Sequence, residues 1–280
     1  MAEREHVDAR FGFGENWRNF LEDVTDDRIR EAESSLREML GLDNLAGADF
    51  LDIGCGSGLF SLAALRLGAD RVHSMDYDPD SVAASSLLRE REAPYSNWTI
   101  ERGDVLDADY MSSLGDHDVV YAWGVLHHTG AMWDALGQTC DRVTPGGRLF
   151  IAIYNDQGRA SRRWLRRKRL YNRLPAVLRR PYVVCVMFPS ELRILAASTL
   201  RGSPRDYVRR WKKPRGRGMS YWHDLVDWVG GYPFEVAKPE DIFRFCRDRS
   251  FQLVELRTVN GGHGCNEFVF RRAENEQDRS

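Results

Sequence analysis

Three glycines at every second position, Gly54, Gly56 and Gly58, end a short apolar run that begins at Phe50. The run has the length of a buried strand, and the apolar spacing over residues 59–67 predicts a helix directly after it. Glycines between a strand and a helix let a ligand approach the backbone, because no Cβ stands in the way. The chain is thereby restricted to folds in which a strand, a glycine loop and a helix follow one another beside a ligand site.

Further strands and helices alternate along most of the chain. An alternation with helices of 10–15 residues predicts βαβ units and a parallel sheet covered on both faces. A glycine turn near the carboxyl end joins two strand-like segments and predicts a closing hairpin. A helix is also predicted at 15–41, before the first strand. The segments after the first helix are strands at 71–75, 97–101, 118–122, 148–154, 251–259 and 266–271, and helices at 79–91, 132–143 and 239–249.

The charge of the chain is unevenly distributed. Residues 159–217 contain 19 lysines and arginines against 2 acidic residues, a balance of +17. The formal net charge is −2, so the remaining residues, with 21 basic and 40 acidic side chains, carry −19. This basic insert contains prolines at 175, 181, 189, 204 and 214. Because proline interrupts helices, we expect the helices of the insert to be short. Such a segment is typical of a helical cap over a substrate pocket, of a surface for anionic membranes or lipid-like substrates, or of RNA binding.

The composition places few other limits on function. With 42% hydrophobic and 29% charged residues, the chain is expected to bury an ordinary globular core. Five widely spaced cysteines with no CxxC pair indicate a reducing compartment, and no signal peptide is visible in the first ten residues. The longest uncharged apolar stretch of the insert, Pro181–Ser190, is too short to span a bilayer. We therefore expect a cytoplasmic protein with no transmembrane segment.

Acidic residues follow each of the first three predicted strands. Asp52 precedes the glycine loop, where its charge would repel a diphosphate and attract a sulfonium or ammonium group. Asp76 ends the second strand, where a carboxylate accepts hydrogen bonds from ribose hydroxyls, and Asp104 follows the third, where it accepts from an adenine amino group. The glycine spacing also departs from the dinucleotide-binding fingerprint GxGxxG, because Leu59 occupies the position of the third glycine in that fingerprint.

These residues resemble the motifs of the class I S-adenosylmethionine-dependent methyltransferases. Residues 52–58 look like the glycine motif of that family, and residues 125–128 and 144–149 are similar to its segments after the fourth strand and before the fifth. The resemblance covers about 45–155 and 237–272 and is nearest to small-molecule O-methyltransferases of the ubiquinone-biosynthesis type.

The resemblance implies a fold, a cofactor and a set of binding residues. The fold is α/β, a doubly wound seven-stranded sheet that is mostly parallel with an antiparallel last strand, plus a basic helical insert between strands five and six. The cofactor is S-adenosylmethionine, and no metal site is expected. The predicted cofactor-binding residues are Asp52, Gly54, Gly56, Gly58, Asp76, Tyr77, Asp104, Val105, Trp123 and Trp17.

Three histidines are candidates for a catalytic base. His128 follows the fourth strand, at the edge where open α/β sheets bind ligands, and its place matches a histidine of related quinone methyltransferases. One of the neighbours His127 and His128 is expected to face the site while the other packs. His263, in the glycine turn of the last hairpin, is the second choice as base. His223 begins an i, i+4 pair with Asp227, which is typical of a capped helix and less often of a metal site.

We predict four parts: an N-terminal helical lid at 1–44, a methyltransferase core at 45–157 and 237–272, a basic helical cap for the substrate at 158–236, and a flexible tail at 273–280. The predicted activity is methyl transfer to a hydroxyl, or else an amine, of a small molecule. An RNA-modifying methyltransferase that uses the insert, and a fold relative that binds S-adenosylmethionine without methylating, are the alternatives. Nucleic acid and peripheral membrane contact remain secondary expectations.

Overall fold

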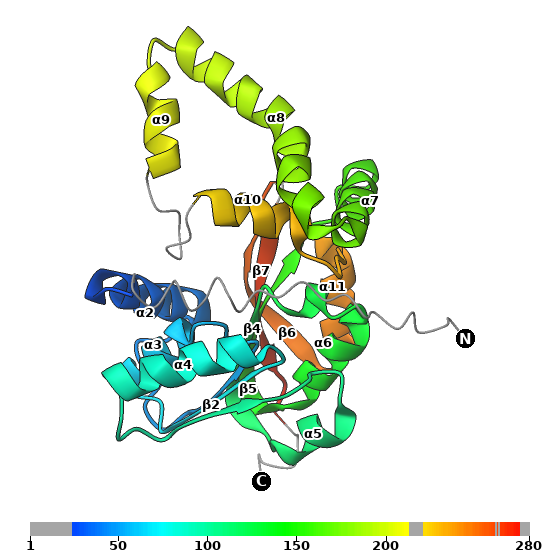
Figure 1. Cartoon of the computed structure of the whole chain (residues 1–280). Helices are drawn as coiled ribbons and strands as arrows, with labels where there is room; N and C mark the ends of the chain where they lie inside the picture. The colour runs from blue at the N-terminus through cyan, green and yellow to red at the C-terminus, as the bar shows by residue number, and fades with distance from the viewer. Residues whose placement is uncertain (1–23, 213–220, 261, 263, 275–280) are drawn as a thin grey trace. The chain divides into compact units, whose positions relative to one another are not determined.

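The computed structural model describes residues 24–212, 221–260, 262 and 264–274. At 204, 206, 212, 223, 224 and 227 it describes the backbone alone. The described residues form two compact units, one of 24–157 with 235–274 and the other within 158–234. The first unit contains the sheet, and the second is helical (Figure 1).

The sheet of the first unit has seven strands in the order β3-β2-β1-β4-β5-β7-β6. The first five pair in parallel, whereas β7 is antiparallel to both β5 and β6. The predicted doubly wound sheet with an antiparallel last strand is thus confirmed, and the helical insert does lie between β5 and β6. The strands are β1 Asp49–Ile53, β2 Arg71–Asp76, β3 Trp98–Arg102, β4 His117–Trp123, β5 Val143–Tyr154, β6 Phe251–Arg257 and β7 Cys265–Arg272.

Helices cover both faces of this sheet. Successive side chains of a strand point to opposite faces, so Phe50 of β1 lies in one core while Leu51 lies in the other. In β5, Phe150 and Ile151 divide in the same way. Figure 1 shows α2, α3 and α4 on one side and α5, α6 and α11 on the other. The helices are α2 Asp26–Leu40, α3 Leu59–Arg66, α4 Pro79–Glu92, α5 Ala108–Ser113, α6 Met132–Asp141 and α11 Pro239–Arg247, with a 3₁₀ turn, η2, at Leu126–His128.

Helix α2 is shorter than predicted and belongs to the core unit. Its side chains Ile29 and Leu36 are buried in the same core as Phe50, against helix α3. Gly41 ends the helix in a left-handed conformation, and its N–H donates to the carbonyl of Arg37. Residues 26–40 therefore pack within the first unit, and a lid at 1–44 stays a prediction. The remainder of the predicted lid, residues 1–23, lies outside the described residues.

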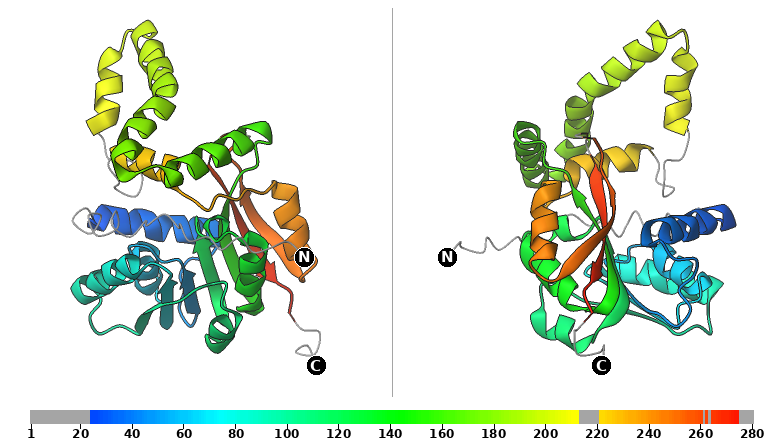
Figure 2. Two further views of the ribbon diagram at one scale, coloured as in Figure 1. Left: turned by 45° about the vertical axis from the view of Figure 1, so that its right-hand side comes forward. Right: turned by 180° about the vertical axis from the view of Figure 1, so that it is seen from behind.

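The helices of the second unit are longer than the sequence predicts. Prolines 181 and 189 favour breaks in the chain, yet both lie inside a single helix of 25 residues. A proline costs a helix one main-chain hydrogen bond and some local strain, and the surrounding turns continue past it here. The helices are α7 Arg159–Arg173, α8 Ala176–Leu200, α9 Pro204–Lys212 and α10 Tyr221–Gly230, and α9 returns beside the end of α8 (Figure 2).

A small core joins the helices of the second unit. Its buried members include Tyr171 of α7, Val183 of α8 and Val229 of α10. Lys168 is fully buried there, donates to the carbonyl of Trp228, and has its ammonium 5.0 Å from the centre of the Trp228 ring. The charge is thus stabilised by a carbonyl and an aromatic face.

By length and composition alone, α8 is a helix that would be able to cross a membrane. The sequence predicts no such segment, because the uncharged stretch Pro181–Ser190 is short. The helix extends well beyond it and passes through Arg179, Arg180, Glu191 and Arg193.

Candidate functional site

The glycine loop lies at the carboxyl end of β1 and is fixed to the end of β2. Gly54, Gly56 and Gly58 all have positive φ, at 73°, 56° and 78°. The Gly54 N–H donates to the carbonyl of Met75 at 2.7 Å, and the Gly56 N–H donates to Asp76 Oδ2 at 2.9 Å. Left-handed backbone at alternate positions explains why glycine stands there. The loop and Asp76 form one hydrogen-bonded unit, as the predicted cofactor site requires.

Asp76 is a carboxylate of this edge with a raised pKa. Its Oδ1 accepts the N–H of Asp78 at 2.9 Å, while Oδ2 accepts from Gly56. Burial raises the pKa of Asp76 from 3.8 to about 6, although the two N–H donors act in the opposite direction. A carboxyl with both oxygens oriented by backbone, and with lone pairs left over, is suited to accept hydroxyl groups from a ligand.

Asp52 lies deeper than the sequence suggests. The residue is 1% exposed, and its Oδ2 accepts the hydroxyl of Ser61 at 2.5 Å. The Ser61 hydroxyl also meets that of Ser74 at 2.7 Å, and Ser74 in turn accepts the indole N–H of Trp98. This buried chain of hydrogen bonds ties β1 to α3, β2 and β3. The predicted attraction between Asp52 and a sulfonium stays a prediction, whereas the structure gives Asp52 a bracing role.

The third predicted acid is linked to the second. The N–H of Gly103 donates to the carbonyl of Asp76 at 3.0 Å, and Asp104 Oδ1 accepts the N–H of Leu106 at 3.0 Å. Val105 is buried in the core, while Tyr77 is 45% exposed beneath the guanidinium of Arg102. The ends of β1, β2 and β3 thus bring the predicted cofactor residues to one edge of the sheet.

The two neighbouring histidines are placed differently. His127 is 1% exposed and its ring lies 3.9 Å, centre to centre, from that of Tyr154. His128 is partly exposed and meets Tyr154 edge-on at 5.4 Å. His127 is therefore the packed member of the pair and His128 the partly exposed one, and the prediction that His128 faces the site stays a prediction.

The segment of His128 adjoins the glycine loop. A Cβ built on Gly54 would stand 2.3 Å from Val125 Cγ2, so the loop and the residues before η2 are in close contact. The turn is also held from the other side, because the N–H of Glu235 donates to the carbonyl of His127 at 2.9 Å. The candidate base thus lies on a fixed turn next to the predicted cofactor loop.

Sequence reasoning missed Tyr154 at this edge and did not identify the contacts of the predicted residue Trp123. Tyr154, the last residue of β5, packs on both histidines. Its position at the end of a predicted strand was the sequence signal that could have identified it as a site residue. Trp123, predicted to bind cofactor, donates its indole N–H to Glu267 of β7 at 2.7 Å. Asn266, 1% exposed, donates to the side chain of Asn155 at 3.0 Å. These contacts join the ends of β4, β5 and β7 into a polar, aromatic wall.

Other predicted site residues are not described. Trp17 and His263 lie outside the described residues, so their roles stay predictions. His223 is in α10 of the second unit, and its side chain and that of Asp227 are also outside them. Within the described part of the chain, no group of three His, Cys, Asp or Glu side chains is arranged to hold a metal ion.

Gly54 offers a sharp test of the loop. We expect Gly54→Ala to lower the free energy of unfolding by about 2–4 kcal/mol. An alanine there would be strained in the left-handed conformation, and its Cβ would also clash with Val125. Urea unfolding measures this loss. Gly47 has a φ of 79° and open space around it, so Gly47→Ala should show the strain alone, about 1 kcal/mol. The double variant Gly54→Ala/Val125→Ala should be more stable than Gly54→Ala; a further loss would contradict the contact.

A family model described as "Methyltransferase domain" matches residues 51–149, which run from β1 into β5. This match and the relatives described below support a class I S-adenosylmethionine-dependent methyltransferase domain in this chain. The topology of the sheet and the glycine loop agree with this assignment, and S-adenosylmethionine is the cofactor of the class.

Curated methyltransferases match this domain over part of their length. The ribosomal protein L11 methyltransferase of Xanthomonas campestris pv. campestris (strain 8004) is 33% identical over 120 residues, 42% of this chain and 35% of that protein. The ubiquinone biosynthesis O-methyltransferase of Methylobacterium sp. (strain 4-46) is 35% identical over 123 residues, 42% of this chain and 46% of that protein. The chain thus spans less than half the length of these relatives.

Solved structures share the fold at low identity. An O-methyltransferase family protein from Burkholderia thailandensis has a TM-score of 0.53 and 16% identity, covering 90% of this chain and 59% of that one. Magnesium protoporphyrin IX methyltransferase from Synechocystis PCC 6803 with bound SAM has a TM-score of 0.53 and 14% identity, covering 96% and 95%. The [4+2]-cyclase SpnF has a TM-score of 0.52 and 13% identity, covering 88% and 81%. The methyltransferase fold is therefore shared with a protein named for another reaction.

Proposed function

We propose that this methyltransferase transfers the methyl group of S-adenosylmethionine to a hydroxyl of a small molecule, with His128 as the general base. The observation that carries the proposal is the placement of a partly exposed imidazole on η2, a turn in contact with the glycine loop. An amine acceptor is the secondary expectation. The relatives' names do not decide the substrate, since they include both a ribosomal protein and a quinone pathway.

The residues of the β1 and β2 ends fit the cofactor. Asp76 presents two oriented oxygens to ribose hydroxyls, and the left-handed glycines leave the loop backbone open to the ligand. Tyr77, Asp104 and Val105 follow the neighbouring strand ends, where the adenosine is expected. When bound, S-adenosylmethionine supplies an electrophilic methyl group on a sulfonium.

The residues beyond β4 and β5 fit the acceptor. Methyl transfer is an in-line displacement, so the acceptor oxygen must be held about 3–3.5 Å from the methyl carbon. A hydroxyl acceptor gains from a base that takes its proton in the transition state, and imidazole has a suitable ordinary pKa. Tyr154 fixes the ring of His127 and borders that of His128, which limits the orientations of the base.

One labelling experiment tests the proposal against its alternatives. The protein is incubated with a metabolite extract, an RNA pool and a protein pool in separate reactions, each with cofactor that carries a deuterated methyl group. We expect a mass gain in a small molecule, with formation of S-adenosylhomocysteine, and an initial rate of labelling lowered by about a hundredfold or more with His128→Ala. Label in the RNA or protein pool alone would refute the small-molecule substrate. Cofactor binding without S-adenosylhomocysteine from any pool would indicate the non-methylating alternative.

A further inference from the structure

Helix α8 of the second unit exposes a row of apolar side chains. Five side chains on it have large exposed fractions: Val177 at 78%, Val184 at 53%, Phe188 at 59%, Leu192 at 52% and Leu195 at 37%. With the exposed Pro181, they recur at steps of three or four residues and so lie on one face of the helix. A helix face in water is normally polar, and soluble monomers rarely expose a large apolar patch. We call these six residues the α8 stripe.

The opposite side of α8 has its own partners. Val183 is fully buried in the small core with α7 and α10, and Val186 and Met187 pack against that core. Glu191, which borders the α8 stripe between Phe188 and Leu195, accepts the hydroxyl of Tyr221 of α10. The apolar side chains of α8 therefore serve two purposes: one face holds the second unit together, and the α8 stripe faces away from that core.

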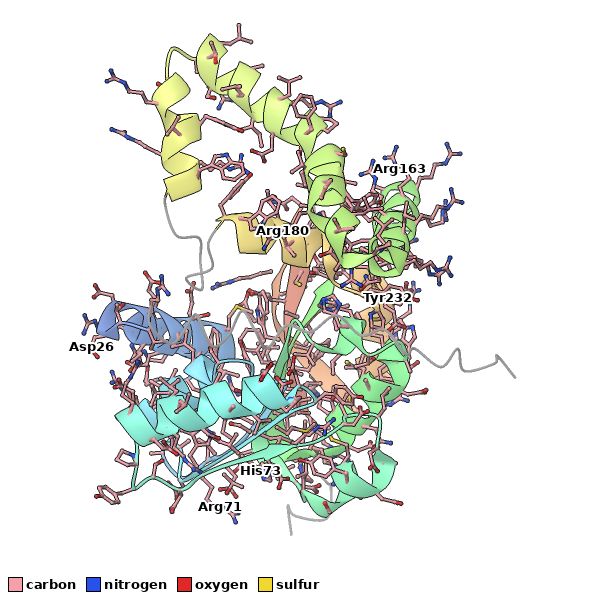
Figure 3. The ribbon with its side chains drawn as sticks, in the orientation of Figure 1. Asp26, Arg71, His73, Arg163, Arg180 and Tyr232 are labelled. Atoms are coloured by element: carbon pink, nitrogen blue, oxygen red, sulfur yellow. The ribbon has the colours of Figure 1, made fainter. Side chains whose placement is uncertain are left out.

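The second unit also carries many exposed cations. Arg180 is exposed on α8, and Figure 3 shows Arg163 among the side chains that project from α7. Exposed arginines of α7 and α9 add to them, and residues 159–217 carry the balance of +17. The exposed arginines of these two helices are Arg159, Arg162, Arg163, Arg166, Arg167, Arg169, Arg173, Arg205 and Arg209.

We propose that the second unit docks on an anionic lipid bilayer, with the α8 stripe inserted at the boundary between headgroups and acyl chains. An apolar helix face together with many arginines is the pattern of helices that lie in this interface. The arginines would contact lipid phosphates while the stripe enters the acyl region. RNA binding would use the cations but would leave the apolar stripe in water, so a bilayer fits more of the surface.

The helix lies in the interface in this proposal and does not span the bilayer. Arg179, Arg193 and Glu191 are spread along its length, and charges at the centre of a bilayer are costly. Packing of its other face on α7 and α10 also prevents lipid from surrounding it. This docking is independent of the methyl transfer proposed above.

Vesicle flotation of the full chain tests the stripe. The probes are vesicles of phosphatidylcholine with and without phosphatidylglycerol. We expect binding to the anionic vesicles, and about a thirtyfold or greater loss of affinity for Phe188→Ser/Leu192→Ser, because two side chains no longer enter the acyl region. The matched control is Leu87→Ser/Val254→Ser in the first unit, whose side chains are 53% and 46% exposed and should leave binding unchanged.

A charge variant and a fluorescent label complete the experiment. Arg163→Glu/Arg166→Glu should weaken binding to anionic vesicles severalfold or more. Cys185, exposed on α8, can carry an environment-sensitive dye in a Cys265→Ser background. Its emission should shift to the blue on anionic vesicles and stay unchanged with phosphatidylcholine alone.

Three results would overturn the proposal. Equal vesicle binding by the serine variant and the wild type would show attraction by charge alone. No vesicle binding, with a dimer that the serine substitutions convert to a monomer, would assign the stripe to a second copy of the chain. No vesicle binding, with tight binding of polyuridylate that the serine variant retains, would assign the unit to RNA.

Discussion

Replacing His128 with alanine is expected to lower kcat by about 10²–10⁴ and to leave the affinity for S-adenosylhomocysteine nearly unchanged. The imidazole is partly exposed on η2, beside the glycine loop but not part of it. Loss of a general base affects the transition state, whereas the cofactor contacts of Asp76 and the loop remain. The acidic limb of the pH–rate profile should also disappear in the variant, because that limb reports protonation of the base. Steady-state kinetics across pH and calorimetric titration measure both effects.

His127 and His263 are the matched controls. His127→Ala should lower the free energy of unfolding by about 2–4 kcal/mol, because a buried ring packed on Tyr154 is lost, while the acidic limb is retained. His263→Ala should also retain the limb. If His263→Ala abolishes the limb and His128→Ala does not, the roles of these two histidines must be exchanged. If neither variant changes it, methyl transfer here relies on positioning without a histidine base.

The parts of the site that could be predicted are those fixed by local chain geometry. An apolar run followed by glycines predicts β1 and its loop. Glycine at alternate positions indicates a turn with left-handed backbone, which other residues rarely adopt. Acidic residues at the ends of successive parallel strands meet at one edge, so the placement of Asp76 and Asp104 at that edge could be predicted from their positions along the chain. The hairpin of β6 and β7 was predicted in the same way from its glycine turn.

The direction of a buried side chain could not be predicted. Whether Asp52 faces a ligand or the interior depends on a hydroxyl nine residues later, at Ser61, which lies beside it only in the fold. Glu235 similarly accepts the N–H of Met132, 103 residues away, and so caps a helix that has no capping side chain of its own. Contacts between distant segments leave no local pattern in one sequence.

Helix α8 was mispredicted because two local rules acted together. Prolines 181 and 189 favoured breaks, and Arg180 and Glu191 limited the uncharged run to ten residues. On the helix, however, the apolar side chains of the α8 stripe recur every three or four residues, with Arg180 and Glu191 at its edge. This period becomes apparent only when both prolines are seen to lie inside one helix.

Asp76→Asn is expected to weaken S-adenosylhomocysteine binding by about 1.5–3 kcal/mol, roughly ten- to a hundredfold, because an amide has one acceptor oxygen and no charge. The wild type should itself lose affinity as the pH falls through about 6, the raised pKa of Asp76, by up to tenfold per pH unit. The variant should lack this dependence. Calorimetric titration between pH 5 and 8 measures both. Equal affinities at neutral pH would contradict the assignment of Asp76 to the ribose.

The same substitution has a signature in the protein without cofactor. The carboxyl of Asp76 binds its proton more tightly when folded, with a pKa of about 6 against 3.8, so its contribution to stability is present below pH 3.8 and is lost as the pH rises to about 6. The amide of the Asp76→Asn variant cannot ionise, and the stability of wild type minus that of the variant should therefore fall by about 3 kcal/mol between pH 4 and 7. Urea unfolding at several pH values measures this difference. The exposed carboxylate of Asp109 is the control, and Asp109→Asn should show a much smaller change. If the stability difference for Asp76→Asn does not change with pH, burial does not raise the pKa of this carboxyl to about 6. Any pH dependence of cofactor binding must then arise from another group.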